Sequence, residues 1–166
     1  AASDVYKRQY WFPAQSPPLL IQYIQDKDLW LFQLENSAEV TAALSSYPKD
    51  FDVWNTLSVD GLAKDGMAIQ RAINIQVFEH VEMATIRNVA GYLVPVVNAT
   101  CYTSEIGGQL NASFPDSPFS AMYFDLADGN RKWSLRSRGE FDVSAIAQTF
   151  GGGGHKNSAG YIELMK

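Results

Sequence analysis

The stretch from Phe150 to Leu164, FGGGGHKNSAGYIEL, follows a predicted helix and ends in a predicted strand. Ordering a glycine loses more backbone entropy than ordering any other residue, so four in a row need a compensating interaction. A single glycine after Phe150 is enough to end a helix. The run Gly151–Gly154 is therefore a flexible linker, a helix stop with surplus glycine, or a place where the backbone meets a ligand.

The residues around the glycine run predict a small α/β domain over residues 90–166. The apolar run Tyr92–Asn98 predicts a buried strand, and its Pro95 indicates a sheet edge or a bulge. The other expected elements are a helix over Ser104–Ala112, two strands joined at Ala127–Asn130, a helix over Val143–Phe150 capped by Asp142, and a final strand in Ala159–Leu164. Their order is β-α-β-β-α-β, which places the chain in the α/β class.

The residues before this domain predict helices. Prolines after Ser16 favour a helix over Pro17–Gln25 with Ser16 as its N-cap. Asn36 and Glu39 have the spacing of a capping box, which predicts a second helix that ends before Pro48.

A long connecting helix is expected from Ser58 to about Arg87, after a short helical turn over Phe51–Leu57. Apolar residues at helical spacing form one stripe along it: Leu62, Ile69, Ile73, Val77, Val81 and Ala84. Its outer face is mostly polar, as expected of a connector. The predicted organisation is a mainly helical part over residues 10–57, a linker helix over 58–89 and the α/β domain over 90–166.

The first nine residues, Ala1–Gln9, show no apolar periodicity. Asp4–Gln9 can be encoded by GATGTGTATAAGAGACAG, which matches a transposon end used to prepare sequencing libraries. We therefore expect residues 1–9 to be translated adapter and the native sequence to begin near Tyr10, in the middle of a gene. A short disordered N-terminal tail is the alternative.

Composition and charge exclude several classes of protein. The 166 residues are 46% hydrophobic and 13% aromatic, which is enough for a substantial core and argues against disorder. With 13 Lys and Arg against 18 Asp and Glu, the net charge of -5 argues against holding long nucleic acid by phosphate neutralisation. The lone Cys101 excludes an intrachain disulfide and a cysteine-based zinc site. No apolar stretch approaches the roughly 20 residues of a membrane-spanning helix, so we expect a cytoplasmic protein without membrane contact.

The glycine run is suited to binding an anion. Consecutive glycines let backbone N–H groups converge on a ligand with no Cβ in the way. His155 follows directly, and an imidazole can donate a hydrogen bond to phosphate. On composition alone, a phosphate site and a flexible loop with an incidental histidine are equally supported.

A second feature favours the phosphate site. The end of the second hairpin strand, Ser134–Arg138, holds two arginines and two serines, and an arginine can bind phosphate through two hydrogen bonds. Arg136 and Arg138 share one face of the strand and Ser137 lies on the other. For Arg138 an ordinary solvated strand end is the favoured interpretation.

Asn98, Ser104 and Glu105 follow the first strand of the domain, where α/β sheets often bind ligands. These residue types also cap helices and form turns, and that interpretation is the favoured one for all three.

Residues 136–164 resemble the C-terminal DHH-associated domain of the DHH phosphoesterase superfamily. The hallmark of that domain is an Arg-Ser pair, a helix, Gly-Gly-Gly-His and an Ala-Gly pair before the last strand. The chain has Arg136-Ser137, Gly152–His155 and Ala159-Gly160 in that order. The resemblance covers residues 90–166 and, more weakly, YIQDKDLW (Tyr23–Trp30), which is similar to the last motif of the catalytic DHH domain.

The resemblance implies a role for each matching residue. Arg136 would hold a substrate phosphate, and Asp26, or Asp28 in its place, would match the late aspartate that binds manganese, a hard cation that prefers oxygen ligands. A helix C-terminal residue on a charged face is an equally supported interpretation of Asp26. The positions expected to bind substrate are Arg136, Ser137, Gly151, Gly152, Gly153, Gly154 and His155.

The resemblance also limits what this chain can do alone. The Asp-His-His motif is absent from the sequence, whose two histidines are His80 and His155, and His80 is interpreted as a bystander in the long helix. Two-metal hydrolysis needs several carboxylates and histidines to fix both ions. We therefore expect an inactive C-terminal fragment of a manganese-dependent phosphoesterase whose N-terminal DHH domain is missing.

The expected substrate is a nucleotide or a short oligonucleotide: a nano-oligonucleotide, a cyclic dinucleotide or a phosphoadenosine phosphate. We expect this chain to bind its phosphate end with micromolar or weaker affinity. One alternative is a stand-alone nucleic-acid-binding module, similar to the domain appended to alanyl-tRNA synthetases. Another is a purely structural domain that forms a homodimer.

Overall fold

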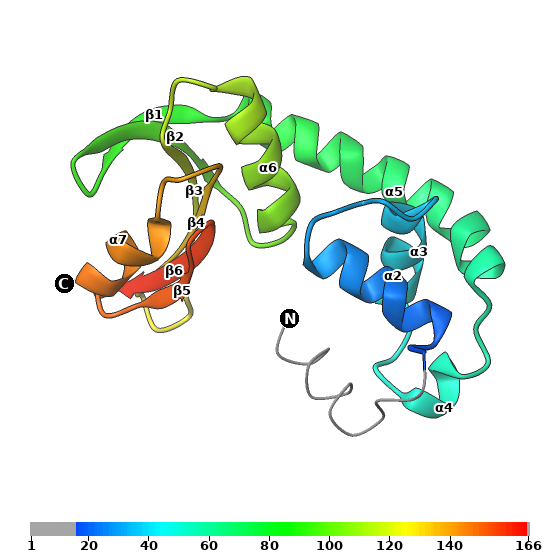
Figure 1. Ribbon diagram of the computed structural model, residues 1–166. Coiled ribbons are helices and arrows are strands. Elements are labelled where there is room, and N and C mark those ends of the chain that lie inside the picture. Colours follow the sequence, from blue (N-terminus) through cyan, green and yellow to red (C-terminus); the bar gives the residue numbers. More distant parts are fainter. Residues whose placement is uncertain (1–15, 166) are drawn as a thin grey trace. The chain divides into compact units, whose positions relative to one another are not determined.

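The computed structural model describes residues 16–165 of the chain (Figure 1). They divide into two compact units with the boundary between Ile73 and Asn74, and each unit has its own hydrophobic core. We call the first the helical unit and the second the sheet unit. The expectation that residues 1–9 are translated adapter lies outside the described residues.

The helical unit is built from short helices and the first part of a long one. Its described elements are α2 (Leu19–Asp28), α3 (Ser37–Ser45), α4 (Phe51–Trp54) and α5 (Val59–Glu82), which continues into the sheet unit. Tyr23, Val40 and Leu62 are buried at the centre of its core. Gly66 lets α5 approach α3, because a Cβ there would lie 1.9 Å from the carbonyl oxygen of Glu39.

Two expected helix caps are not formed. The N-cap of α2 is Pro18 rather than Ser16, because a residue that precedes proline, as Pro17 does, is disfavoured in the helical conformation. Asn36 is the N-cap of α3, but its backbone is left-handed (φ 55°) and its side chain does not cap the helix. The expected capping box with Glu39 is therefore not formed, since that motif needs an extended N-cap residue.

Helix α5 confirms the predicted apolar stripe but is shorter than expected. Leu62, Ile73, Val77 and Val81 are buried along it. Its outer face is less polar than predicted, since large apolar side chains are exposed at Met67, Ile75 and Phe78. The helix ends at Glu82 rather than near Arg87, because the next residues pair as a strand.

The sheet unit contains a six-stranded sheet with strand order β1-β2-β3-β4-β6-β5. The strands are β1 (Thr85–Val89), β2 (Tyr92–Asn98), β3 (Phe119–Asp125), β4 (Arg131–Ser137), β5 (Gly153–His155) and β6 (Ser158–Glu163), and the helices are α6 (Thr103–Ser113) and α7 (Val143–Thr149). Only β2 and β3 pair in parallel. The α/β class and the order β-α-β-β-α-β are confirmed, and β1 and β5 extend the sheet at its two edges.

The additional strand β1 is joined to β2 by a two-residue turn. Ala90 and Gly91 both have positive φ (54° and 89°), the conformation that a tight hairpin turn favours. Because of β1, Pro95 lies in an interior strand, and the expectation of a sheet edge was wrong. The proline is tolerated where β2 is paired on one side only, opposite Ile86, since pairing with β3 begins at Val96.

The two helices of the sheet unit cover opposite faces of the sheet (Figure 1). Phe119 and Leu135 share a core with Val143 of α7. Their sequence neighbours point the other way: Ser120 Oγ donates a hydrogen bond to the carbonyl oxygen of Gly107 in α6 (3.2 Å). We call this second side the α6 face.

Candidate functional site

Gly151 is required by the end of helix α7. Its backbone is left-handed (φ 76°), and its N–H donates to the carbonyl oxygen of Gln148 (3.0 Å). The N–H of Gly152 donates to the carbonyl oxygen of Ala147 (2.8 Å). This pair of bonds is the Schellman motif, in which the left-handed position favours glycine.

Gly152 and Gly154 are required by packing against β6. A Cβ on Gly152 would lie 2.2 Å from the carbonyl oxygen of Gly160, and one on Gly154 would lie 2.5 Å from that of Ser158. Gly153 differs from its neighbours. It is exposed, its φ is not positive, and a Cβ there would meet no atom within 4 Å. The fold therefore gives no reason for glycine at position 153.

His155 and Arg136 lie on the same face of the sheet. β5 pairs His155 with Ser158 of β6, and β6 pairs Ser158 with Arg136 of β4. Directly opposed residues of antiparallel strands point to the same side, so these three form a row across three strands. Gly153 and Gly160 form a pair two residues further along the same two strands, so they lie on the same face. Strands lie about 4.8 Å apart, so roughly 10 Å separates the backbones of Arg136 and His155.

Arg136 is held against helix α6. Its Nη2 donates to Ser104 Oγ (3.1 Å) and its Nη1 to the carbonyl oxygen of Leu135 (2.9 Å). Gly107 makes room for it, because a Cβ there would lie 2.5 Å from Arg136 Cγ. Burial lowers the pKa of the Arg136 guanidinium below its ordinary value, and Glu105 acts in the opposite direction. An arginine stays charged in proteins, so Arg136 presents a fixed, partly desolvated positive charge.

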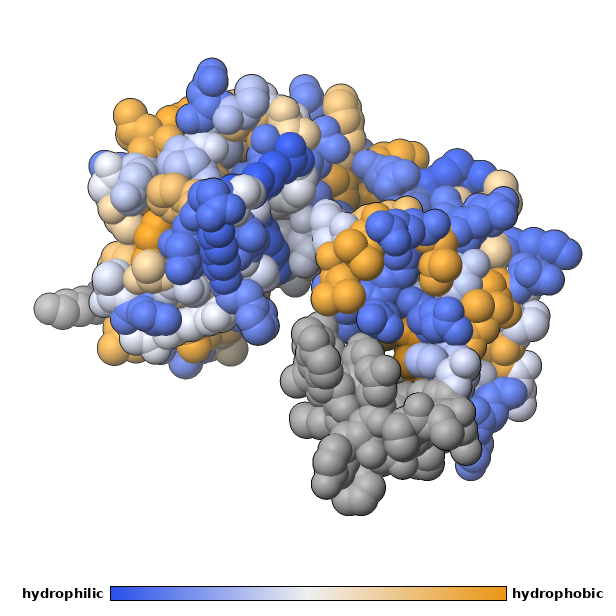
Figure 2. Space-filling view, viewed as in Figure 1, coloured by the Kyte–Doolittle hydropathy of each residue, from blue (hydrophilic) through white to orange (hydrophobic). Residues whose placement is uncertain are grey.

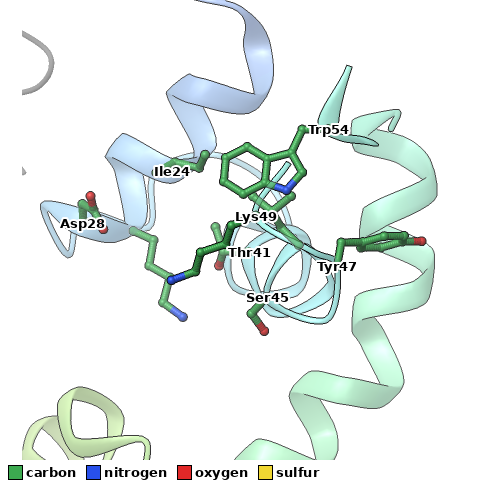
Figure 3. Close-up of a pocket in the computed structure, with 9 residues that line it drawn as sticks. Ile24, Asp28, Thr41, Ser45, Tyr47, Lys49 and Trp54 are labelled. Carbon is green, nitrogen blue, oxygen red and sulfur yellow. The ribbon is translucent and has the colours of Figure 1, made fainter. Parts of the chain in front are cut away.

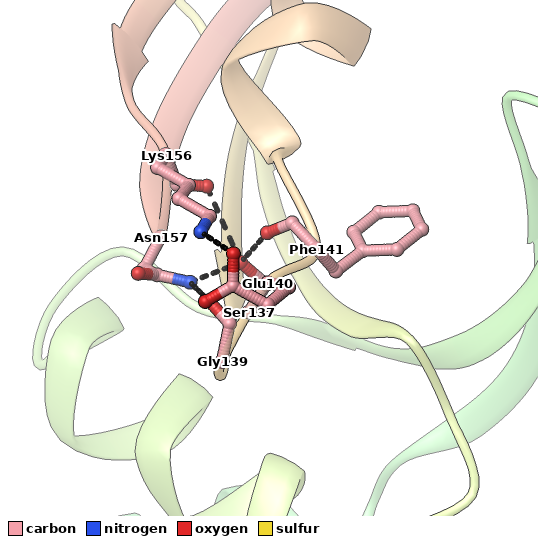
Figure 4. Close-up of polar contacts among 6 residues, drawn as sticks. All are labelled: Ser137, Gly139, Glu140, Phe141, Lys156 and Asn157. Carbon is pink, nitrogen blue, oxygen red and sulfur yellow. Dashed lines mark hydrogen bonds and ion pairs between the residues drawn. The ribbon is translucent and has the colours of Figure 1, made fainter.

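Ser137 belongs to a polar cluster, which we call the clamp (Figure 4). Ser137 Oγ donates to the carbonyl oxygen of Phe141 (2.7 Å) and accepts from Asn157 Nδ2 (3.0 Å). The clamp thus ties the loop after β4 to the turn that follows His155. Its members are Ser137, Gly139, Glu140, Phe141, Lys156 and Asn157. The motif analysis assigned Ser137 and Arg136 to one binding site, but they lie on opposite faces of β4. Ser137 contacts the clamp, whereas Arg136 contacts helix α6.

The remaining polar candidates are distributed differently. Ser104, expected to act in capping, instead contacts Arg136, whereas Asn98 is exposed at the end of β2. Arg138 is exposed as expected, and its Nη2 donates to the carbonyl oxygen of Gly108 in α6 (2.5 Å). His80 is half-buried on helix α5, whereas Arg136 and His155 belong to strands β4 and β5.

A hollow of about 320 Å³ adjoins the glycine run. Gly151, Gly152 and Gly160 line it, together with Lys132 of β4. Lys132 comes near the glycines only because β4 and β6 pair it with Ile162, so sequence spacing gave no signal for it. Its ammonium lies 5.8 Å from the centroid of the Phe124 ring of β3, on the side of β4 that faces away from the glycine run.

Asp26 has a structural role in the helical unit. Its carboxylate is buried, and its two oxygens accept hydrogen bonds from the backbone N–H groups of Gln33 (2.9 Å) and Leu34 (3.2 Å). Burial alone would raise the pKa of Asp26, but the nearby Ser37 hydroxyl and the hydrogen bonds from these two N–H groups hold it below the ordinary value. Asp26 therefore fixes the loop after α2 in its ionised form.

The described residues do not supply a metal site. Within residues 16–165, no group of three or more His, Cys, Asp or Glu side chains lies close enough to hold a metal ion. Each oxygen of Asp26 keeps one further lone pair, so one coordination bond to manganese is compatible with its present contacts. Asp28, the competing choice, is exposed at the end of α2.

The chain is similar in sequence to known proteins. No protein-family model matches the chain. It is 29% identical over 163 residues to an uncharacterised protein of Acanthamoeba polyphaga mimivirus, which covers 92% of this chain and 38% of the relative. It is 37% identical over 70 residues to oligoribonuclease NrnB of Bacillus subtilis strain 168, which covers 42% of this chain and 17% of the relative. The chain thus spans well under half the length of both relatives.

One solved structure is similar to this chain at the level of the fold. A pGpG-specific phosphodiesterase, PggH of Vibrio cholerae, matches 95% of this chain and 66% of its own chain with a TM-score of 0.50 and 10% identity. An exopolyphosphatase-related protein of Bacteroides fragilis matches 71% of this chain and 39% of its own at 19% identity, with a lower TM-score of 0.42. The likeness to PggH concerns the fold alone.

None of the helices within residues 16–165 combines the length and the apolar character needed to cross a bilayer.

Proposed function

We propose that this chain is the substrate-binding part of a DHH-family phosphoesterase that hydrolyses short nucleotide or oligonucleotide phosphoesters. In this proposal the α6 face beside β5 binds the phosphate end of the substrate through Arg136, His155 and the backbone at Gly153. NrnB is an oligoribonuclease and PggH a pGpG phosphodiesterase by name, and their likeness to this chain supports a substrate of that size.

The observation that carries the proposal is Gly153. Helix termination explains Gly151, and packing explains Gly152 and Gly154, whereas Gly153 has open space around it. A glycine without a folding reason, on the same face as Arg136 and His155, leaves backbone that a ligand can approach closely. Glycine at this position therefore favours ligand binding over a flexible loop.

Hydrolysis itself is assigned to residues outside the described part of the chain. We propose that manganese is held mainly by the DHH domain of a longer protein and that Asp26 contributes one ligand at most, since residues 16–165 lack a cluster that could hold an ion alone. A two-metal site lowers the pKa of a bound water and stabilises the leaving oxygen. In this proposal the sheet unit orients the substrate phosphate. We also propose that the protein works in the cytoplasm, and a homodimer is compatible with substrate binding by the sheet unit.

The test is a titration of the isotope-labelled chain with the dinucleotide pApA and with pAp, followed by two-dimensional NMR. The amides of Gly151–His155 and the Arg136 guanidinium are expected to shift, with micromolar or weaker affinity. In Gly153→Val the affinities for pApA and for pAp should each fall at least about tenfold while the fold is kept. A loss of about 1.4 kcal/mol of binding free energy corresponds to that factor.

A matched control adds bulk at another exposed position. Ala72→Val introduces the same branched side chain on helix α5, and its binding of pApA should equal that of the parent chain. Unshifted Gly153 and His155 amides at millimolar pApA would contradict the proposal. So would equal weakening by both substitutions.

A further inference from the structure

The helical unit contains a pocket of about 570 Å³ that the proposed function does not use (Figure 3). Residues of α2, α3 and α4 and of the segment between α3 and α4 line it, all within one unit. The side chains that matter for its chemistry are Lys27, Lys49, Asp28, Trp54, Thr41 and Ser45.

The pocket has a positive balance of charge. Lys27 and Lys49 bring two ammonium groups and Asp28 one carboxylate, which leaves one net positive charge. Figure 3 shows the Lys49 side chain extended within the pocket near Thr41. Lys49 forms no ion pair or hydrogen bond with any other residue of the described range 16–165. Its ammonium is available to an anionic ligand.

Trp54 supplies an aromatic surface whose orientation is already fixed. Its Nε1 donates to the carbonyl oxygen of Pro48 (2.8 Å), and its ring makes an edge contact with Phe51 at 6.1 Å between centroids. A ring held in this way loses little conformational entropy when a flat ligand stacks on it. Aromatic stacking of a nucleobase contributes about 1 to 3 kcal/mol.

The hydroxyl groups of the pocket are acceptors rather than donors. Thr41 Oγ1 donates to the carbonyl oxygen of Ser37 (2.7 Å), and Ser45 Oγ donates to that of Ala42 (2.6 Å). Each hydroxyl has one proton, so the free lone pairs of Thr41 and Ser45 can only accept. They suit a ligand that carries hydroxyl or amino donors as well as a negative charge.

We propose that this pocket binds a nucleoside monophosphate, with the phosphate at Lys27 and Lys49, the base against Trp54, and ribose or amino donors at Thr41 and Ser45. The site is distinct from the α6 face, because every residue that lines it belongs to the helical unit. If the proposed function holds, a mononucleotide is a product of the reaction, and the pocket is then a product-binding site.

The test uses the whole chain and three probes. AMP is expected to shift the Trp54 indole N–H and the Lys49 amide in two-dimensional NMR, whereas adenosine and inorganic phosphate should bind at least about tenfold more weakly, because each offers only half of the contacts. Equal affinity for inorganic phosphate would overturn the proposal in favour of a simple anion site. No shift at Trp54 and Lys49 with about 10 mM AMP would overturn it as well.

Variants separate this pocket from the site on the sheet. Lys49→Gln and Trp54→Phe should each weaken AMP binding about tenfold, the loss expected for a charge-assisted hydrogen bond or a stacking contact. Lys64→Gln removes an exposed lysine of α5 that does not line the pocket and should change nothing. In Gly153→Val the AMP shifts at Trp54 should persist, so failure of the sheet site and failure of this pocket give different results. Equal AMP affinity in Lys49→Gln and Lys64→Gln would contradict the proposal.

Discussion

The glycine run of the sheet unit and the loop after α2 in the helical unit both carry motif residues, but the fold uses them differently. In the glycine run the fold requires three of the four residues, and Gly153 is left open beside His155. In the loop after α2 both oxygens of Asp26 already accept backbone N–H groups. A motif residue is available to a ligand only to the extent that hydrogen bonds and packing within the fold have not already used it.

The loop that Asp26 holds has an unusual backbone and surface. Trp30 and Phe32 have positive φ (58° and 49°), which side chains other than glycine rarely adopt. They and their neighbours Leu29 and Leu31 are exposed. Figure 2 shows apolar patches, in orange, among the hydrophilic surface. Hydrogen bonds to Asp26 offset the strain of this conformation, so the carboxylate is needed by the loop whatever else it binds.

The largest expected effect comes from placing the same side chain at two adjacent glycines. Gly152→Val should destabilise the sheet unit by about 3 kcal/mol, because its Cβ would overlap the carbonyl of Gly160 and the backbone of Tyr161. Gly153→Val should change stability by less than about 0.5 kcal/mol, because its side chain meets open space. Urea unfolding followed by NMR signals of the sheet unit measures both.

These two substitutions test whether Gly152 is needed for packing and Gly153 for ligand binding. Gly152→Val lowers binding only through the loss of folded protein, whereas Gly153→Val lowers binding of pApA with the fold intact. If both substitutions destabilised the sheet unit to a similar extent, the fold would need glycine at both positions. The backbone of Gly153 would then be no more available to a ligand than that of Gly152.

The next effect concerns Asp26 and depends on pH. A carboxyl group with a lowered pKa stabilises the folded state above its unfolded pKa, and this contribution is lost as the pH falls through the folded value. Hydrogen bonds hold the pKa of Asp26 below the ordinary 3.8 against the effect of burial. Asp26→Asn should therefore lower the unfolding midpoint of the helical unit at pH 7, and the difference from the parent chain should shrink as the pH falls below about 4.

Asp28→Asn is the matched control for this measurement. It removes an identical charge two residues away, at an exposed position of α2. Its unfolding midpoint should follow that of the parent chain at every pH. If Asp28→Asn and Asp26→Asn behaved alike, the effect would be one of net charge rather than of the two backbone hydrogen bonds.

Sequence reasoning predicted the parts of the fold that local patterns determine. The apolar stripe of α5, the strand Tyr92–Asn98, the turn at Asp128-Gly129 and the cap at Asp142 follow from periodicity and from turn and cap chemistry. Strand β1 was missed because the helical pattern continued into it, although the Ala90-Gly91 turn signalled a hairpin. The caps at Ser16 and Asn36 failed because backbone conformation decides whether a side chain can reach the helix end.

The sequence identified candidate residues for the site, and they stay a prediction, but it did not show how they are arranged. The motif Arg136-Ser137 suggested that both side chains bind substrate, whereas strand alternation places Ser137 in the clamp. Ser104 and Lys132 are close to the site only through tertiary packing and strand register, which no local pattern encodes. That Gly153 alone is unused by the fold depends on the atoms around each glycine and is not visible in the sequence.

A smaller effect is expected from the clamp. Ser137→Ala removes the hydroxyl that donates to Phe141 and accepts from Asn157, within a buried setting, and should destabilise the sheet unit by about 1 to 2 kcal/mol. Because Asn157 lies in the turn after His155, the loss should also broaden the His155 NMR signal and weaken pApA binding. Ser113→Ala, which removes an exposed serine hydroxyl at the end of α6, is the control and should change neither stability nor pApA binding.

The smallest effect is expected at the exposed end of the same clamp. Glu140 and Lys156 form an ion pair at 2.6 Å, and the hydrogen bond from Lys156 lowers the pKa of Glu140. The Glu140 side chain is almost fully exposed, however, and water and salt screen such pairs, so they add little to stability. Glu140→Gln should leave the unfolding midpoint unchanged at low and at high salt, and it should leave pApA binding unchanged. If Glu140→Gln destabilised the sheet unit as much as Ser137→Ala, the ion pair rather than the buried hydroxyl would organise the turn after His155, and the clamp would depend on salt.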